Sequence, residues 1–203
     1  RHGPTLTIEG RDETGKARAW YVRLWNYATG TSEDAEVVRR LKAAGAVFLG
    51  KQNLHEFAYG GSSAVSFFGP VHNPWNPEHV AGGSSSGSAA SVAAGLCFGA
   101  IGTDTAGSIR EPAAICGIVG LKPTYGRVSR YALLPRVWSL DTVGPLTRTV
   151  ADNAMFMSVI AGHDPRDALT SRRAVPDYAG ALGRDIKGLR LAVVTEMTWP
   201  DGV

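Results

Sequence analysis

The feature that most constrains the fold is a dense run of small residues, GGSSSGSAASVAAG, in which glycine and serine give way to alanine. The stretch Ser88–Leu96, which begins inside this run, is small and apolar and predicts a closely packed helix. The preceding region, Ala58–Gly87, is rich in Gly, Ser, Pro and Asn and predicts a long loop. Because loops of that length are usually functional or disordered, the junction of loop and helix is a candidate functional segment.

Helical and strand-like patterns alternate along the chain. Residues 32–44 have an N-cap Ser or Thr, acids in the first turn and apolar side chains at helical spacing. The apolar run Ala46–Gly50, bounded by glycine, predicts a buried strand. The other expected elements are strands at Phe98–Gly102, Ile118–Leu121 and Leu189–Val194, a tight turn at Thr103–Arg110, and helices at Pro112–Cys116 and Thr149–Ala161. This alternation is typical of an α/β protein.

Composition and charge exclude several classes of protein. With 44% hydrophobic and 19% charged residues, the chain of 203 residues is not intrinsically disordered and is long enough for one domain with a core. A net charge of +3 without a dense Lys/Arg block gives no reason to expect direct contact with nucleic acid. The least polar stretch, Ala89–Gly102, is too short to span a bilayer, so no membrane partner is expected.

The cysteines and histidines bear on location and on cofactors. Cys97 and Cys116 are too few for a disulfide framework and are expected to be buried free thiols, which fits a reducing cytoplasm. The first ten residues lack the apolar region of a signal peptide. His55 and His72 have no partners at ligand spacing, and neither a Cys pair nor H-E-x-x-H is present. No metal and no other cofactor is expected.

Three interpretations compete for Gly82–Ser88. A flexible linker does not usually open an Ala-rich helix. A phosphate loop needs Lys-Ser/Thr after its G-x-x-x-x-G spacing, and Ser88-Ala89 stands there instead. Gly83–Gly87 matches the nucleophile elbow G-x-S-x-G, with Ser85 as nucleophile, but an elbow follows an apolar strand and the preceding residues are not one. None of the three is convincing from this segment alone.

A second segment, Gly102–Arg110, brings small residues directly after an expected strand. Small residues let backbone N–H groups converge on one point, as an oxyanion hole requires, and Ser108 would present its hydroxyl beside them. An ordinary strand-to-loop turn explains the same residues, and such turns are common. Taken alone, this segment favours the ordinary turn.

Longer motifs favour a catalytic role for these two segments over an ordinary turn. The runs GTDTAGSIREPAAICGIVGLKPTYGRVSR, SLDTVGPLTRTVADNA, VIAGHDPRD and GKQNLHEFAYG, with HNPWNPEHVAGGSSSGS and the Gly/Ser/Ala run above, closely resemble the amidase signature family. The resemblance extends from about Thr31 to the end of the chain. This family includes aliphatic and aryl amidases and the A subunit of glutamyl-tRNA amidotransferase. It implies an α/β fold with a mixed β-sheet core covered by helices, present here in part.

The resemblance also implies a Ser-Ser-Lys mechanism. Ser108 would be the nucleophile, and Ser84, which follows a cis peptide bond in the family, would relay protons to the base. The backbone N–H groups of Thr105, Ala106, Gly107 and Ser108 would form the oxyanion hole, with Ala106 where Gly is usual. A relay serine suits amide cleavage, because the leaving nitrogen must be protonated as it departs.

The family lysine is missing from this chain. By the family's usual spacing its position falls on Glu9, and a carboxylate is a far weaker base for a serine hydroxyl. Lys51 matches a different family lysine, in a Gly-Lys-x-Asn motif, and is expected to be a structural lysine near the site. We therefore expect an atypical N-terminal segment over residues 1–31 and a partial amidase signature domain over residues 32–203.

A frameshift is one hypothesis for the atypical segment. Ile8–Arg11 can be written ATC GAA GGA CGA, and deleting the first G after ATC yields Ile-Lys-Asp, the family motif. Tyr21–Trp25, written TAC GTA CGG CTC TGG and read one base later, gives Thr-Tyr-Gly-Ser, which is again family-like. Glu9 to about Gly30 would then be a frameshifted copy, with the frame restored near Thr31. A divergent segment is the rival explanation.

The leading functional hypothesis is hydrolysis of carboxamide C–N bonds by Ser108 and Ser84, impaired by the missing lysine. The partner would be a small-molecule amide, with a homo-oligomer or companion subunits also open. An amidotransferase A subunit would need companion chains, although Tyr131–Ser139 looks more like stand-alone amidases. A non-catalytic remnant of the fold is the third possibility.

An esterase of a different class is the last alternative. It would use Ser85 as nucleophile, with His163 and either Asp141 or Asp152 as its partners. His163 lies in Gly-His-Asp-Pro, which is also typical of a turn that ends a helix. The positions of these four side chains in the fold decide between the two interpretations.

Overall fold

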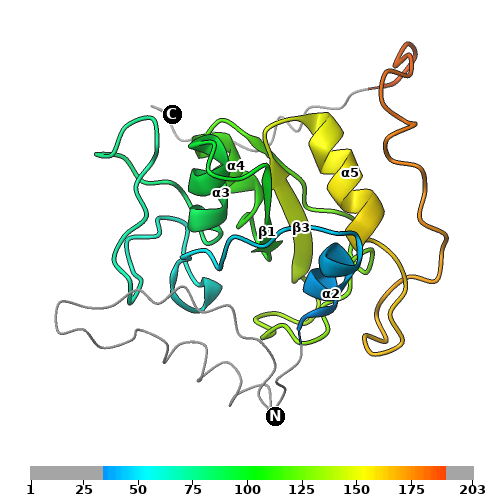
Figure 1. Cartoon of the computed structure of the whole chain (residues 1–203), viewed down its shortest axis with the longest axis horizontal. Coiled ribbons are helices and arrows are strands. Elements are labelled where there is room, and N and C mark those ends of the chain that lie inside the picture. The colour runs from blue at the N-terminus through cyan, green and yellow to red at the C-terminus, as the bar shows by residue number, and fades with distance from the viewer. Residues whose placement is uncertain (1–33, 191–203) are drawn as a thin grey trace.

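The structure of the protein, a computed structural model, describes residues 34–190 (Figure 1). Its elements, in chain order, are α2 (Glu36–Ala43), the 3-10 helix η1 (Glu56–Ala58), α3 (Ser86–Ala93), β1 (Gly99–Asp104), α4 (Arg110–Ile115), β2 (Val119–Gly120), β3 (Thr142–Thr147) and α5 (Val150–Ile160). Within the described range, the three strands form one antiparallel sheet in the order β1-β3-β2. The expectation of an α/β fold is confirmed.

The central strand β3 is buried on both faces. Side chains alternate along a strand, so Val143 and Leu146 point to opposite sides of the sheet. Val143 packs into an apolar cluster with α2 and α5, and Leu146 packs into a second cluster with α3 and α4. Figure 1 shows this arrangement, with α3 and α4 to the left of the strands and α5 to the right. The sheet is therefore the middle layer between two layers of helices.

The strand β3 was not expected from the sequence, because TVGPLT contains two residues that are uncommon in strands. A Cβ on Gly144 would lie 2.1 Å from the carbonyl oxygen of Leu121, so only glycine fits there. Pro145 has no N–H to donate, and the pairing with β2 covers only Leu146 and Thr147, the two residues that follow it. Tertiary contacts, and not local propensity, make this segment a strand.

The strand expected at Ala46–Gly50 is wrong. The segment has no regular secondary structure and pairs with no strand within residues 34–190. Phe48 packs against the first apolar cluster, whereas the side chains of Val47 and Leu49 are 85% and 61% exposed. An apolar run reveals burial potential but not a hydrogen-bonding neighbour, and a strand needs both.

Most other expected elements are confirmed with shifted bounds. They are the helices expected at residues 32–44, 88–96, 112–116 and 149–161 and the strands expected at 98–102 and 118–121. Because β1 continues to Asp104, the turn after it is shorter than expected. The strand expected at Leu189–Val194 lies almost wholly outside the described residues. Over the described range, no helix combines the length and the apolar character that a membrane crossing requires.

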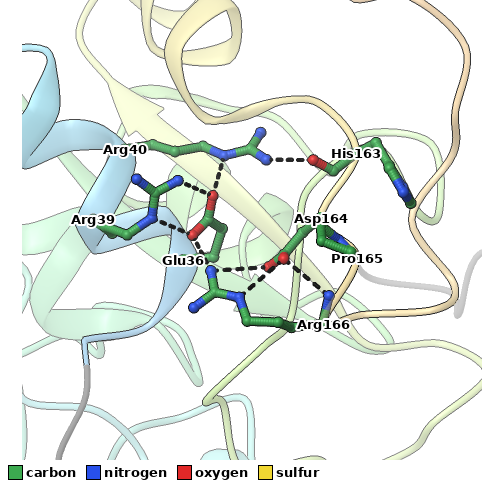
Figure 2. Close-up of a pocket in the computed structure, with 7 residues that line it drawn as sticks. All are labelled: Glu36, Arg39, Arg40, His163, Asp164, Pro165 and Arg166. Atoms are coloured by element: carbon green, nitrogen blue, oxygen red, sulfur yellow. Dashed lines mark hydrogen bonds and ion pairs between the residues drawn. The ribbon is translucent and has the colours of Figure 1, made fainter.

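A buried carboxylate attaches α2 to the segment that follows α5 (Figure 2). Glu36 is only 2% exposed and accepts hydrogen bonds from Arg39, Arg40 and Arg166. Arg40 also donates to the carbonyl oxygens of Ile160, Ala161 and His163. The hydrogen bond from Arg39 is the largest influence on the Glu36 carboxyl and lowers its pKa from 4.5 to about 2, although burial acts in the opposite direction.

This shift predicts a specific loss of stability in acid. A lowered folded-state pKa stabilises the fold above the unfolded value, and the contribution disappears as the pH falls from 4.5 towards 2. The contribution is on the order of 3 kcal/mol at neutral pH. We expect the difference in unfolding free energy between wild type and Glu36→Gln, measured with urea, to be largest above pH 5 and to vanish near pH 2.

Asp34→Asn is the matched control for that measurement. Asp34 forms an exposed ion pair with Lys42 beside the same helix, 2.5 Å between Nζ and Oδ2. Exposed pairs contribute about 0–1 kcal/mol, so this variant should follow the wild-type curve closely. A Glu36→Gln curve parallel to wild type at every pH would contradict the assignment.

Candidate functional site

Two adjacent glycines bring the long loop close to α4 before α3 begins. Gly82 has a φ of 75°, and a Cβ on it would lie 2.8 Å from the Cα of Pro112. A Cβ on Gly83 would lie 2.6 Å from the carbonyl oxygen of Gly60. The hydroxyl of Ser63 donates to the carbonyl oxygen of Gly82 at 2.8 Å and closes the same contact from the other side. The double glycine is therefore required by close packing.

Ser84, which follows the two glycines, has a buried hydroxyl without a hydrogen-bond partner in the described residues. Its peptide bond to Gly83 is cis, as the family resemblance implied. The backbone N–H of His55 donates to its carbonyl oxygen at 3.1 Å. The side chain is 1% exposed, and its Oγ has no hydrogen-bond partner within residues 34–190. Buried hydroxyls are usually paired, so an unpaired one marks Ser84 as a candidate functional group.

Ser85 and Ser88 serve the packing of α3 on β1, whereas the buried hydroxyl of Ser86 is unpartnered in the described residues. Ser85 Oγ accepts a hydrogen bond from the N–H of Thr103 and donates to the carbonyl oxygen of the same residue, both at 3.2 Å. Ser88 Oγ donates to the carbonyl oxygen of Ile101 at 2.8 Å. A Cβ on Gly102 would lie 2.7 Å from Ser85 Oγ, so helix and strand approach closely. The role of Ser85 is thus structural.

The esterase alternative is wrong on the same evidence. Its histidine, His163, bonds through Nδ1 to the hydroxyl of Thr170 at 3.0 Å. Asp152 lies in the first turn of α5, where its carboxylate accepts from the hydroxyl of the N-cap residue Thr149 at 2.7 Å. Ser85, His163 and the two aspartates lie in separate hydrogen-bond groups, so no triad forms in the described part of the chain. The sequence placed them together only through their residue types.

The second segment forms an open turn directly beside Ser84 and Ser85. The N–H of Ser85 donates to the carbonyl oxygen of Ser108 at 3.2 Å, which links the two serine segments. Ser108 is half-buried at the start of α4. Among the described hydrogen bonds, none uses the backbone N–H of residues 105–108 as donor. A row of free N–H groups beside a serine hydroxyl is the arrangement that stabilises a developing oxyanion.

A buried carboxylate holds the far end of this turn. Asp104 is 0% exposed and accepts hydrogen bonds from the N–H groups of Ile109 and Arg110 at 3.2 and 3.3 Å. The guanidinium of Arg110 adds two more, at 2.9 and 3.0 Å. Burial acts to raise the pKa of Asp104, but these hydrogen bonds outweigh it and lower the pKa. Asp104 and Arg110 therefore form a structural ion pair.

The turn needs glycine at one position only. Gly107 has a φ of 151°, in the region that favours glycine. Ala106 does not have a positive φ. Alanine in place of the usual glycine is therefore compatible with the turn.

Two further charged groups have shifted pKa values. Partial burial lowers the pKa of the Lys51 ammonium group, with Asp34 opposing, although the residue as a whole is exposed. Burial, and then the charge of Asp104, raises the pKa of Glu111, whose carboxyl lies against Gly61. Glu9, the residue at the family lysine position, lies outside the described residues.

The hollow shown in Figure 2 is a different place. Its volume is about 350 Å³, and its lining residues are Glu36, Arg39, Arg40, His163, Asp164, Pro165 and Arg166. The carboxylates of Glu36 and Asp164 bind the arginine side chains of this hollow. Glu36 does so through the hydrogen bonds described above, and Asp164 through its contact with Arg166. This hollow lies within the ion network that attaches α2, and of the site residues expected from the sequence only His163, from the esterase alternative, lines it.

Asp141 is the site residue whose role the sequence did not reveal. Its carboxylate accepts a hydrogen bond from the hydroxyl of Thr105 at 2.6 Å. The sequence suggests it only as a partner of His163 in the esterase alternative. The two linked residues are 36 positions apart, and no local pattern signals such a contact.

Comparisons with known proteins identify the family of this chain. The sequence profile described as Amidase matches residues 23–202, well over half of the chain. The A subunit of the Glutamyl-tRNA(Gln) amidotransferase of Synechococcus sp. (strain WH7803) is 58% identical over 170 residues, which is 84% of this chain and 35% of that protein. The chain thus spans about a third of the length of the curated relatives it matches.

Solved structures show the same likeness. The Glutamyl-tRNA(Gln) amidotransferase A subunit from Thermotoga maritima superposes with a TM-score of 0.70 and 53% identity, covering 71% of this chain and 32% of that one. The peptide amidase from Stenotrophomonas maltophilia gives a TM-score of 0.69 and 51% identity, covering 73% of this chain and 32% of that one. On the profile match and these identities, the chain belongs to the amidase family.

Proposed function

We propose that this chain carries the acylation centre of an amide-cleaving serine enzyme. Ser108 is the nucleophile, the N–H groups of residues 105–108 are the oxyanion hole, and Ser84 is the relay. The observation that carries the proposal is the row of unpaired N–H groups beside Ser108, held from one end by Asp104. The unpartnered buried hydroxyl of Ser84 supports it independently.

The chemistry follows from these positions. As Ser108 Oγ bonds to the carbonyl carbon, its proton moves to Ser84, and Ser84 passes its own proton towards a base. The carbonyl oxygen gains negative charge and is stabilised by the free N–H groups. The C–N bond then breaks, and a proton returned through Ser84 reaches the leaving nitrogen. In the family the base is a lysine, and its position here holds Glu9.

The missing base should affect amide cleavage more than the reaction of Ser108 with an activated probe. Cleavage of an unactivated amide needs proton transfer both to and from the serine pair, so it should be slow in this chain. Reaction of Ser108 with a fluorophosphonate releases fluoride, which leaves without protonation. The nucleophile and the oxyanion hole can therefore be tested apart from amide turnover.

The first prediction from the proposed function concerns Ser108. A fluorophosphonate probe should label the folded chain, and peptide mapping should place the adduct on Ser108. Ser108→Ala should abolish the adduct, whereas Ser85→Ala should keep it, because Ser85 Oγ bonds only to the backbone of Thr103. An adduct that survives in Ser108→Ala and disappears in Ser85→Ala would reverse the assignment.

The second prediction concerns the relay. Ser84→Ala should slow the labelling of Ser108 by about 10²-fold, the scale of a lost proton-transfer group. Ser86→Ala is the matched control, because Ser86 is 0% exposed and its Oγ is also unpartnered in the described residues. Both variants remove an unpaired buried hydroxyl, so their unfolding free energies should stay close to wild type. Equal labelling rates in the two variants would rule out the relay.

The third prediction concerns residues 9–30, for which we keep the frameshift hypothesis. The gene, read one base later through this segment, should encode Ile-Lys-Asp and Thr-Tyr-Gly-Ser. A chain carrying that alternative translation should label at Ser108 about 10²-fold faster than the present one. The gain should disappear when the new lysine is changed to methionine. If the codons give neither motif, the segment has diverged and the hypothesis is lost.

Within the family, we place the chain nearer to the amidotransferase A subunits than to stand-alone amidases. The curated relative reported above carries that name at 58% identity, and the solved Thermotoga protein of the same name is 53% identical. The preference drawn from Tyr131–Ser139 for a stand-alone enzyme is weaker evidence, since it covers nine residues. The peptide amidase, at 51% identity, keeps the hydrolase as the second candidate.

Partners and location follow from the same proposal. An amidotransferase component would act with companion chains that bind tRNA and supply the acceptor, and its substrate would be a small-molecule amide. A cytoplasmic location is supported by Cys97 and Cys116, which are both free thiols in the structure. Cys116 is buried as expected, whereas Cys97 is only half-buried.

A further inference from the structure

We propose that Asp141 is a positioning residue for the oxyanion turn and acts through the hydroxyl of Thr105. This inference rests on the proposed function and adds to it a group outside the serine segments. Asp141 does not belong to the turn and donates nothing to a substrate. Its role is to fix the direction of the first peptide of the turn.

The carboxylate of Asp141 joins two segments of the chain. Its Oδ1 accepts from the hydroxyl of Thr105 at 2.6 Å. Its Oδ2 accepts from the N–H groups of Arg136 and Val137 at 2.6 and 2.8 Å. Each oxygen is therefore committed to one side, and the carboxylate cannot rotate without breaking a hydrogen bond. A short hydrogen bond between a hydroxyl and a carboxylate is also among the stronger kinds.

Asp141 is held in place by the paired strands β1 and β3. Asp141 directly precedes β3, and the β1–β3 register pairs Asp104 with Thr142. Thr105 and Asp141 are the next residues outward along the two paired strands, so the sheet itself sets their separation. The segment after Asp141 is buried throughout β3.

The loop before Asp141 is fixed as well. The guanidinium of Arg136 donates to the carbonyl oxygen of Ala58 at 2.7 Å. The same guanidinium lies 4.2 Å from the centre of the Tyr59 ring. The loop that donates to Oδ2 is therefore held against the η1 region, and Asp141 has fixed neighbours on both sides.

The turn needs such a support because it lacks internal hydrogen bonds. The N–H groups of residues 105–108 have no acceptor in the described structure. Asp104 holds only the end that leads into α4, through Ile109 and Arg110. The carbonyl oxygens of Gly107 and Ser108 accept hydrogen bonds from the N–H groups of Glu111 and Ser85, so the later part of the turn is held on that side as well. At Thr105, the first residue of the turn, the described hydrogen bond is the one to Asp141. A misplacement of about 1 Å at a reacting centre can lower a rate about 10²-fold.

The test compares two substitutions at one position. Thr105→Val keeps the shape of the side chain and removes the hydroxyl, and Thr105→Ser keeps the hydroxyl. We expect the fluorophosphonate labelling rate of Ser108 to fall at least about 10-fold in Thr105→Val and to recover to within about 3-fold of wild type in Thr105→Ser. Asp141→Asn, which replaces one acceptor oxygen by a donor, should fall as far as Thr105→Val.

The chain supplies a matched control at the other end of β3. The hydroxyl of Thr149 donates to the carboxylate of Asp152 at 2.7 Å, the same kind of contact. Thr149→Val removes it, together with the N-cap of α5, and should destabilise the fold as much as Thr105→Val or more. Its labelling rate should stay at the wild-type value. A purely structural role for Thr105 would make the two valine variants behave alike.

A second readout keeps the inference separate from the proposed function. In ¹⁵N relaxation measurements, the amides of residues 105–108 should have order parameters of about 0.85 in wild type and about 0.6 or less in Thr105→Val. If wild type is not labelled at all, the proposed function fails, and these order parameters still decide the inference. Wild-type labelling in Thr105→Val, or an unchanged order of the turn, overturns it.

Discussion

The buried carboxylate of Asp104 is the interaction on which the rest of the site depends. It ends β1, has no exposed surface, and binds the first N–H groups and the guanidinium of α4. Strand and helix are thereby joined by a short turn, residues 105–108, whose N–H groups are left without acceptors in the described structure. A charge buried to this degree is tolerated because several hydrogen bonds surround it. The open turn at Ser108 is a direct consequence of this attachment.

The layered packing explains why so many small residues stand around the site. The sheet is covered on both faces, and β3 contributes Val143 to one apolar cluster and Leu146 to the other. Glycine at position 102 lets α3 approach β1, and glycines 82 and 83 let the loop pass α4 and residue 60. The serine hydroxyls in these contacts divide into two kinds. The hydroxyl of Ser85 is hydrogen-bonded to the backbone of β1, and the hydroxyl of Ser84 has no partner in the described residues.

Membership of the amidase family does not by itself mean that every catalytic group of the family is present in this chain. The family match covers most of the chain, while the chain covers about a third of its relatives. The residues to which we assign the nucleophile, the relay and the oxyanion hole lie within residues 84–108, and all are present. The position of the family lysine falls in a different part of the sequence, on Glu9. Under the proposed function, proton transfer and oxyanion stabilisation are carried by distinct segments, so one can be lost while the other persists.

Sequence alone was enough for the family, the α/β class, the helices and both serine segments, because these depend on local periodicity and on contiguous motifs. It was not enough for β3, since Gly144 and Pro145 oppose a strand locally and only packing against both neighbours makes one. It suggested a false strand at residues 46–50, because a strand also needs a partner. Three-dimensional packing separated the roles of Ser84 and Ser85 and brought Asp141 to Thr105. The physical reason is the same in each case: hydrogen-bond partners far apart in sequence are chosen by the fold and leave no local pattern.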